Sequence, residues 1–256
     1  MNRIKGKRAL ITGATSGIGK AIAAHFAELG CHLLITGRRE ERLKELASDL
    51  YERHSIEVQI SCFDIRDLEA CKQFATQHKG TSIDVLVNNA GLAKGVDSVQ
   101  SGSFDDWNAM IDTNVKGLLA MTRLFLPEMI ERNSGHIINI GSTAGHEAYP
   151  GGVTYCATKH AVKAITESTK KDVHGTKVRV SMVSPGLVET EFSNVRFSGD
   201  NDRADSVYKG MDPLTAEDIA EIVVFVANRP NHVNILDSIV MPVAQSSAQM
   251  VHRDEN

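Results

Sequence analysis

The chain has 256 residues, within the range of one α/β domain, and its 42% hydrophobic and 23% charged residues are typical of a soluble protein. The net charge of −4, the polar N-terminus and the lack of a long apolar run argue against a nucleic-acid partner, a membrane partner and a secretory signal. Four cysteines without C-x-x-C spacing and ten scattered histidines predict buried free thiols in a cytoplasmic protein without a metal site.

The first expected strand, Arg8 to Thr12, runs into a glycine-rich turn and then into a helix from about Gly17 to Leu29. The turn has the spacing G-x-x-x-G-x-G, which lets the backbone approach a pyrophosphate beside the free N–H groups of the helix start. A tight turn without a ligand is the alternative, but the strand–turn–helix context favours nucleotide binding. The predicted cofactor-binding residues here are Gly13, Ala14, Thr15, Ser16, Gly17, Ile18 and Gly19.

The second expected strand, His32 to Thr36, ends in Gly37-Arg38-Arg39. Rossmann proteins that bind NAD place an acidic residue at this point, on the ribose 2′-hydroxyl. Two arginines and no acid favour the 2′-phosphate of NADP instead. The alternative is that Arg38 and Arg39 only begin the charged helix that follows.

The third and fourth expected strands, Glu57 to Cys62 and Ile83 to Val87, also end in candidate site residues. Asp64 can accept a hydrogen bond from an adenine amine, or it can cap the helix that begins near Asp67. The fourth strand is apolar except for Asp84, a pattern typical of a buried parallel strand, and ends in Asn88-Asn89-Ala90-Gly91. The two amides can join neighbouring strands to the wall of a cofactor site.

A long helical pattern from Phe104 to Glu131 has Asn114 near its middle. Asparagine is a poor helix former, so this position predicts a local kink or a bound water. A plain packing role is the alternative.

The strand His136 to Ile140 leads through Ser142 to a break at Pro150-Gly151-Gly152 and a helix that carries Tyr155 and Lys159. Tyr155 and Lys159 are four residues apart and therefore share one helical face. A phenol has a pKa of about 10, and a neighbouring ammonium is expected to lower it toward neutrality. With a Ser142 hydroxyl to hold a carbonyl oxygen, these residues are candidates for acid–base catalysis on an alcohol or ketone, although an isolated Y-x-x-x-K pair is usually a solvated surface pair.

The region after this helix has little strand signal from Leu187 to Thr215, which is long for a passive loop. We interpret residues 187–215 as a substrate lid with short helical pieces, and the tail from Pro242 has no predicted role. The other expected elements are the helix to about His174, the strand Lys177 to Val183, the helix Ala216 to Ala227 and the strand near Ser238 to Met241.

Strands and helices alternate along the chain, which predicts an α/β, Rossmann-type doubly wound parallel sheet of about seven strands with helices on both faces. One domain, residues 1–256, accounts for the pattern. Sites in such folds form at the carboxyl ends of the strands. The candidates expected to meet there are the glycine-rich turn, Arg38, Asp64, Asn89, Ser142 and Pro185.

Together these motifs resemble the short-chain dehydrogenase/reductase family over nearly the whole chain. The motifs and residues that carry this resemblance are T-G-A-T-S-G-I-G at 12–19, N-N-A-G at 88–91, Asn114, Ser142, Y-C-A-T-K at 155–159 and P-G at 185–186. A closer resemblance is to the NADP-dependent 3-hydroxy acid (serine) dehydrogenases, a group that includes sulfoacetaldehyde-reducing members. The motifs that carry this resemblance are E-F-S-N-V-R-F-S-G-D at 191–200, H-V-N-I at 232–235 and M-P-V-A-Q-S at 241–246. The segment L-V-E-T-E-F after Gly186 is slightly shorter than in a bacterial relative, which leaves the choice of substrate open.

The resemblance implies reversible hydride transfer between NADP(H) and a small 3-hydroxy acid such as serine, 3-hydroxypropionate or 3-hydroxyisobutyrate. It implies that Tyr155 moves the proton, Lys159 lowers the pKa of Tyr155 and holds the ribose, Ser142 orients the substrate oxygen and Asn114 positions a relay water. It also implies a homotetramer paired through the long helices. The further cofactor contacts that it implies are Asp64, Ile65, Asn89, Ala90, Gly91, Tyr155, Lys159, Pro185, Gly186, Val188 and Thr190.

A 3-hydroxy acid brings a carboxylate close to the reacting carbon, and burying that charge unpaired is costly. Arg196 is the first basic residue after Pro185-Gly186, and its guanidinium suits a carboxylate or a sulfonate. Tyr149 can add a hydroxyl. The alternative is that Arg196 is an exposed lid charge paired with Glu191 or Asp200.

Two other functions stay open from the sequence. One is NADPH-dependent reduction of another small aldehyde or ketone, such as sulfoacetaldehyde. The other, which the intact catalytic residues disfavour, is a non-catalytic NADP-binding regulator.

Overall fold

The computed structural model describes residues 2–254, and a seven-stranded sheet forms the centre of this part of the chain. The strand order is β3-β2-β1-β4-β5-β6-β7, and each neighbouring pair is parallel. The strands are β1 Arg8–Ile11, β2 His32–Gly37, β3 Val58–Cys62, β4 Val85–Asn88, β5 Gly135–Ile140, β6 Val178–Pro185 and β7 Asp237–Val240. This order confirms the predicted doubly wound Rossmann-type sheet.

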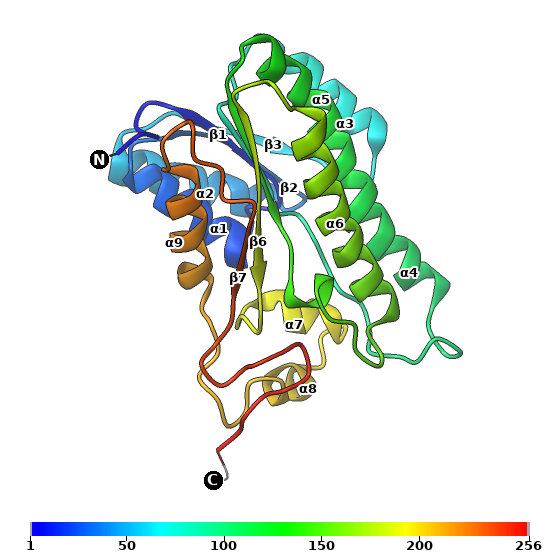
Figure 1. The fold of residues 1–256 in the computed structure, drawn as a ribbon. Helices are drawn as coiled ribbons and strands as arrows, with labels where there is room; N and C mark the ends of the chain where they lie inside the picture. The colour runs from blue at the N-terminus through cyan, green and yellow to red at the C-terminus, as the bar shows by residue number, and fades with distance from the viewer. Residues whose placement is uncertain (1, 255–256) are drawn as a thin grey trace.

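Helices cover both faces of the sheet (Figure 1). One face carries α1 Gly17–Glu28, α2 Glu40–His54 and α9 Ala216–Ala227. The other carries α3 Leu68–Gln77, α4 Phe104–Ile111, α5 Leu118–Glu131 and α6 Val153–Asp172.

The alternation of side chains along each strand explains this two-sided cover. Ala9 and Ile11 of β1 pack with the residues of α1 and α9, whereas Leu10 between them packs with Phe74 of α3 and Met121 of α5. Successive side chains of a strand point to opposite faces, so a strand that is buried on both faces, such as β4 with Val85, Leu86 and Val87, is mainly apolar. This is the apolar pattern seen in the sequence of the fourth strand.

The predicted irregularity at Asn114 is confirmed. A π-helical turn, Asp112–Gly117, separates α4 from α5. The Asn114 side chain is buried there, where its Oδ1 accepts from the Leu92 N–H at 2.8 Å and its Nδ2 donates to the Leu92 carbonyl at 2.8 Å. The turn therefore directs a polar side chain into the protein, a common use of π-helical turns near functional sites.

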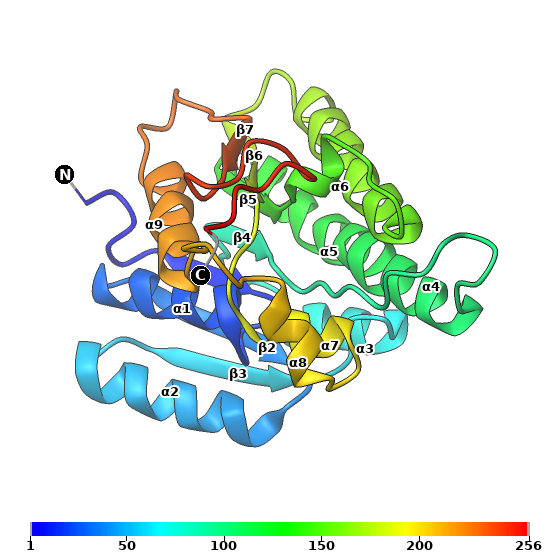
Figure 2. The same ribbon diagram turned by 90° about the horizontal axis from the view of Figure 1, so that it is seen from below.

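Residues 187–215 cross the carboxyl end of the sheet and contain two short helices, α7 Glu191–Arg196 and α8 Asn201–Ser206 (Figure 2). The predicted short helical pieces are thus confirmed. The tail after β7 runs across the same end of the molecule (Figures 1 and 2).

All four cysteines are free. Cys31, Cys71 and Cys156 are buried as predicted, but Cys62 is exposed because it is the last residue of β3, a strand at the edge of the sheet. Within residues 2–254, no helix has both the length and the apolar character needed to cross a bilayer.

Candidate active site

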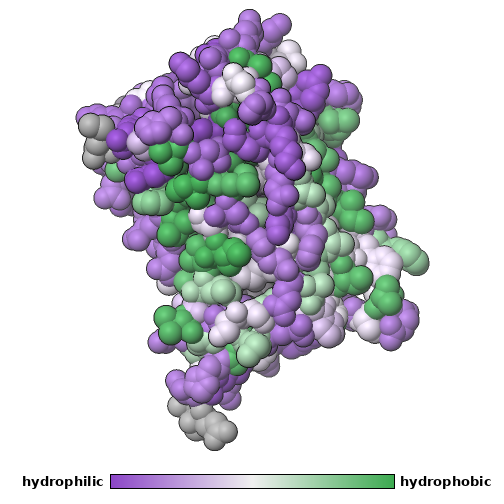
Figure 3. Space-filling view, in the orientation of Figure 1, coloured by the Kyte–Doolittle hydropathy of each residue, from purple (hydrophilic) through white to green (hydrophobic). Residues whose placement is uncertain are grey.

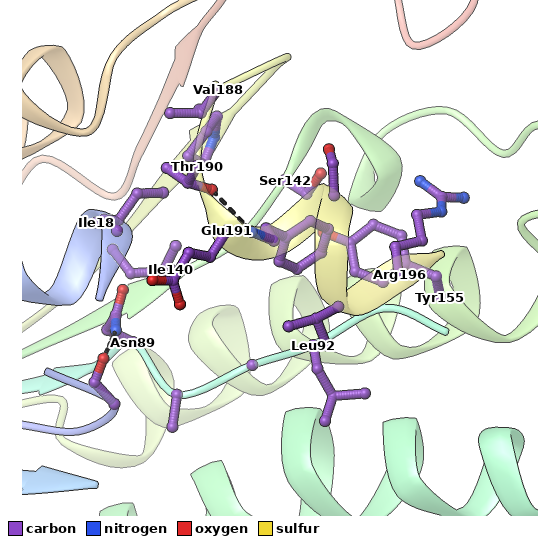
Figure 4. A pocket seen from close by; sticks show the side chains of 18 of the residues that line it. Ile18, Asn89, Leu92, Ile140, Ser142, Tyr155, Val188, Thr190, Glu191 and Arg196 are labelled. Atoms are coloured by element: carbon purple, nitrogen blue, oxygen red, sulfur yellow. Dashed lines mark hydrogen bonds between the residues drawn. The ribbon is translucent and has the colours of Figure 1, made fainter. Parts of the chain in front are cut away.

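A cavity of about 630 Å³ opens where the strands end, between the sheet and α7. This size is typical of small-molecule and cofactor sites. Every sequence-predicted site residue lines it except Ala14 and Asn114. Ser142, Tyr155 and Arg196 lie toward one end of the cavity, whereas Ile18 and Asn89 lie toward the other (Figure 4).

The glycine-rich turn at the second end has no room for a side chain at Gly13 or Gly19. Gly13 has a φ of +69°, and a Cβ there would lie 2.9 Å from the Ala90 Cα. Asn89 fixes the turn from the neighbouring strand, because its Nδ2 donates to the carbonyls of Thr12 at 2.9 Å and Gly13 at 3.1 Å. The bare backbone at the N-terminus of α1 therefore faces the cavity, which fits a pyrophosphate.

The two arginines at the end of β2 have different surroundings. Arg39 donates to the hydroxyls of Thr15 at 2.9 Å and Ser16 at 2.7 Å, and to Glu191 Oε2 at 2.8 Å. Arg38 is 57% exposed and lies 3.6 Å from an Asp64 oxygen, beyond hydrogen-bond distance. Arg39 thus joins α7 to the glycine-rich turn, whereas Arg38 keeps an exposed guanidinium at the cavity.

Asp64 does not cap the following helix. Asp67 does so, because its Oδ1 accepts from the N–H groups of Glu69 at 2.9 Å and Ala70 at 3.0 Å. Asp64 instead binds Arg66, with a shortest N–O distance of 2.6 Å, and this hydrogen bond holds the pKa of its carboxyl below the usual value. The capping alternative for Asp64 is therefore wrong.

Ser142, Tyr155 and Lys159 meet at the first end of the cavity. Ser142 caps a short 3₁₀ turn, Thr143–Gly145, where its hydroxyl accepts from the Ala144 N–H at 3.1 Å. Tyr155 and Lys159 extend from the first turns of α6, and the Lys159 Nζ lies 5.8 Å from the centre of the Tyr155 ring. A hydroxyl, a phenol and an ammonium thus converge from β5 and α6.

The predicted effect of Lys159 on Tyr155 is wrong for this structure. Burial, followed by the nearby Tyr149, raises the pKa of Tyr155, although hydrogen bonding to Ser142 partly opposes the rise. The Lys159 ammonium donates to the Ile140 carbonyl at 2.9 Å, and burial lowers its own pKa to about 8. The phenol therefore stays protonated at neutral pH, which is the form that can donate a proton.

Arg196, the last residue of α7, lies near Tyr155 (Figure 4). It donates to the Tyr149 hydroxyl at 3.2 Å and the Gly95 carbonyl at 3.2 Å, and its guanidinium carbon lies 5.8 Å from the Tyr155 ring centre. Glu191 is held by Arg39 and Arg42, and Asp200 caps α8, so the predicted alternative pairing of Arg196 on the surface is wrong.

Asn114 and Ala14 lie behind the cavity wall. Asn114 Nδ2 also donates to the Thr158 hydroxyl at 3.1 Å, so it holds the segment after Gly91 against α6. The relay role of Asn114 stays a prediction. Ala14 is fully buried and binds the Thr36 carbonyl through its N–H at 3.0 Å.

Several cavity residues were not predicted from the sequence. Phe192 packs its ring 5.8 Å from that of Tyr155, while Gln245 and Ala248 reach the cavity from the C-terminal tail. The one available signal was their position inside or beside the segments 191–200 and 241–246.

A parallel sheet that ends in a glycine-rich turn, with a half-buried tyrosine beside a buried lysine, defines a dinucleotide-binding protein with acid–base groups. Residues 7–201 match the family model of the short chain dehydrogenases, and the chain belongs to this family.

The chain is similar to several named dehydrogenases and reductases. NADP-dependent 3-hydroxy acid dehydrogenase YdfG of Shigella flexneri is 48% identical over 248 residues, which cover 95% of this chain and 98% of that protein. Sulfoacetaldehyde reductase 2 of Chromohalobacter salexigens is 45% identical over 249 residues, 96% of this chain and 98% of that protein. The closed form of a serine dehydrogenase complexed with NADP⁺ has a TM-score of 0.90 and 47% identity, and the match covers 96% of this chain and 100% of that one.

Proposed function

We propose that this chain is an NADP-dependent oxidoreductase that interconverts a small 3-hydroxy acid, of the serine, 3-hydroxypropionate or 3-hydroxyisobutyrate type, and its 3-oxo acid or semialdehyde. The observation that carries this proposal is the Arg196 guanidinium, which lies beside the Tyr155 ring and is bound to the Tyr149 hydroxyl. A cation next to a proton donor suits an acid that carries its hydroxyl nearby. The 48% identity to a 3-hydroxy acid dehydrogenase supports the same substrate class.

Each residue of the active site has a distinct role in the proposed reaction. Bound NADP(H) supplies or accepts the hydride. Ser142 holds the substrate oxygen, and Tyr155 gives a proton to that oxygen during reduction and takes it back during oxidation. Lys159, fixed by the Ile140 carbonyl, holds the ribose, and Arg196 with Tyr149 binds the carboxylate.

The cofactor residues follow the length of the cavity. The turn Gly13–Gly19 receives the pyrophosphate and Arg38 the 2′-phosphate, with Asp64 and Ile65 at the adenine. The remaining contacts come from Asn89, Ala90, Gly91, Pro185, Gly186, Val188 and Thr190, which line the same cavity.

A substrate panel assayed by NADPH absorbance, with NAD(H) in parallel, tests this function. We expect turnover of 3-hydroxy acids with NADP and little with NAD. A second candidate is the reduction of sulfoacetaldehyde, because a guanidinium binds a sulfonate as well as a carboxylate and a sulfoacetaldehyde reductase is 45% identical. Nucleotide binding without turnover of any panel member would indicate a non-catalytic regulator instead.

Arg38→Asp is expected to lower the preference for NADP over NAD by about tenfold, the low end for a charge-assisted hydrogen bond because the side chain is half exposed. The ratio of kcat/KM for the two cofactors measures it. Arg39→Ala is the matched comparison, since Arg39 already binds Thr15, Ser16 and Glu191. Unchanged ratios in Arg38→Asp would make Arg38 only a surface charge.

We propose a homotetramer, because two separate faces of the chain expose large apolar side chains. Figure 3 shows apolar patches on the face over α9 and β7, where Phe225, Leu236 and Ile239 are exposed. Phe104, Ile111 and Leu119 are exposed along α4 and α5, on the other side of the sheet. Two self-complementary faces give closed assemblies of four. Light scattering should give four times the 27.9 kDa of one chain at micromolar concentration, whereas a monomer would contradict the proposal.

We also propose a cytoplasmic location. The four free cysteines support it, because free thiols persist in a reducing compartment.

A further inference from the structure

The tail after β7 is tied to the cavity through a buried amide. Gln245 is 5% exposed, and its Oε1 accepts from the Leu187 N–H at 2.8 Å while its Nε2 donates to the Ser247 carbonyl at 3.0 Å. A Cβ at Gly186 would overlap the same oxygen. Gln245 and Ala248 both line the cavity, so the tail forms part of its wall.

A single carboxylate holds the other side of this tail. The two oxygens of Glu147 accept from the Ala248 N–H at 2.9 Å, the Ser247 hydroxyl at 3.3 Å and the Gln249 amide at 3.4 Å. These hydrogen bonds hold the pKa of the Glu147 carboxyl below its usual value. Glu147 lies two residues before Tyr149, so the contact joins the tail to the substrate end of the cavity.

The tail also reaches the far end of the segment 187–215. The Asp254 N–H donates to the Gly210 carbonyl at 2.8 Å, and the Arg253 side chain donates to the Val207 carbonyl at 2.9 Å. The tail therefore spans from the loop that carries Tyr149 to the segment that carries Arg196, across the carboxyl end of the sheet (Figures 1 and 2).

We propose that residues 245–248, here called the C-terminal strap, limit the size of the substrate that the active site accepts, and that Glu147 is the positioning residue that holds Ala248 in the wall. The inference rests on the proposed function, because it concerns the substrate end of that site. Hydrogen bonds to an ionised carboxylate are stronger than neutral ones, so Glu147 can fix Ala248 within the loop that the bridge between Gln245 and Val251 closes. With the strap fixed, the side chain at position 248 decides how much room a substrate has.

Two variants test the strap in opposite directions. Glu147→Ala frees the strap, so kcat/KM for 3-hydroxyhexanoate relative to 3-hydroxypropionate should rise about tenfold, the low end of the discrimination for one methylene. Ala248→Leu narrows the cavity, so the same ratio should fall by about as much. Glu147→Gln keeps an acceptor for the Ala248 N–H and should restore most of the wild-type ratio.

The controls distinguish failure of the strap inference from failure of the proposed function. Absence of turnover by the wild-type enzyme with the whole series would overturn the proposed function, and the strap inference with it. Wild-type turnover together with an unchanged ratio in both Glu147→Ala and Ala248→Leu would overturn the strap inference only. NADPH affinity near wild type shows that each variant is folded, and a new protease cut in the tail of Glu147→Ala shows that the strap was released.

Discussion

Tyr155→Phe is expected to abolish turnover in both directions and to leave the affinity for NADP near wild type. The change removes one hydroxyl from a half-buried ring that also packs on Phe192, so the wall of the cavity keeps its shape. A positioned acid–base group contributes about 10²- to 10⁴-fold to the rate. The rate of NADPH oxidation, followed by absorbance, measures the loss of kcat. A titration followed by NADPH fluorescence measures the dissociation constant of the nucleotide.

Lys159→Ala is the comparison that distinguishes the role of Lys159 from that of Tyr155. Its ammonium is buried and bound to the Ile140 carbonyl, so its removal changes the ribose end of the site as well as the charge near Tyr155. We expect it to lower both turnover and nucleotide affinity. If Tyr155→Phe kept near-wild-type activity, the proton donor would have to be another group.

The fold was predictable because its causes are local or repeat along the chain. The apolar run Val85-Leu86-Val87 indicates burial on both faces, and a glycine at position 13 is needed where a Cβ would meet Ala90. The spacing of Tyr155 and Lys159 on one helix face is equally a local property. These features place the candidate residues at one end of the sheet whatever the details of packing.

The electrostatics of the site could not be predicted in the same way. The Lys159 ammonium donates to the carbonyl of Ile140, 19 residues earlier in the chain, and Phe192 and Arg196 of α7 pack near the Tyr155 ring. A four-residue spacing fixes which residues are near each other but not which way an ammonium points. The sign of the Tyr155 pKa shift therefore depends on tertiary packing.

The contacts made by the segments that cross the carboxyl end of the sheet could not be predicted from the sequence either. Glu191 binds Arg39 from a position 152 residues away, and Glu147 binds Ala248 across 101 residues. Each side chain would serve equally well as a solvated surface charge, and only the folded chain shows its partner. The sequence can therefore mark a lid and a tail without showing what holds either of them.

Arg196→Ala is expected to lower kcat/KM for 3-hydroxy acids by roughly hundredfold, within the range for loss of one partner of a buried charge pair. The guanidinium lies beside the Tyr149 and Tyr155 rings, so the substrate carboxylate would lose its cation in a partly buried site. Arg196→Lys keeps the charge without the planar fork, and we expect it to recover only part of the loss.

Uncharged substrates test whether the loss of kcat/KM in Arg196→Ala arises from the substrate carboxylate. Arg196 also donates to the Gly95 carbonyl, so its removal can loosen α7 for any substrate. Short-chain alcohols and ketones without a carboxylate should therefore change by no more than a few-fold in Arg196→Ala, measured in the same NADP(H) assay. Equal losses for charged and neutral substrates would mean that Arg196 supports the cavity wall, and the choice of an acidic substrate would then depend on groups other than this guanidinium.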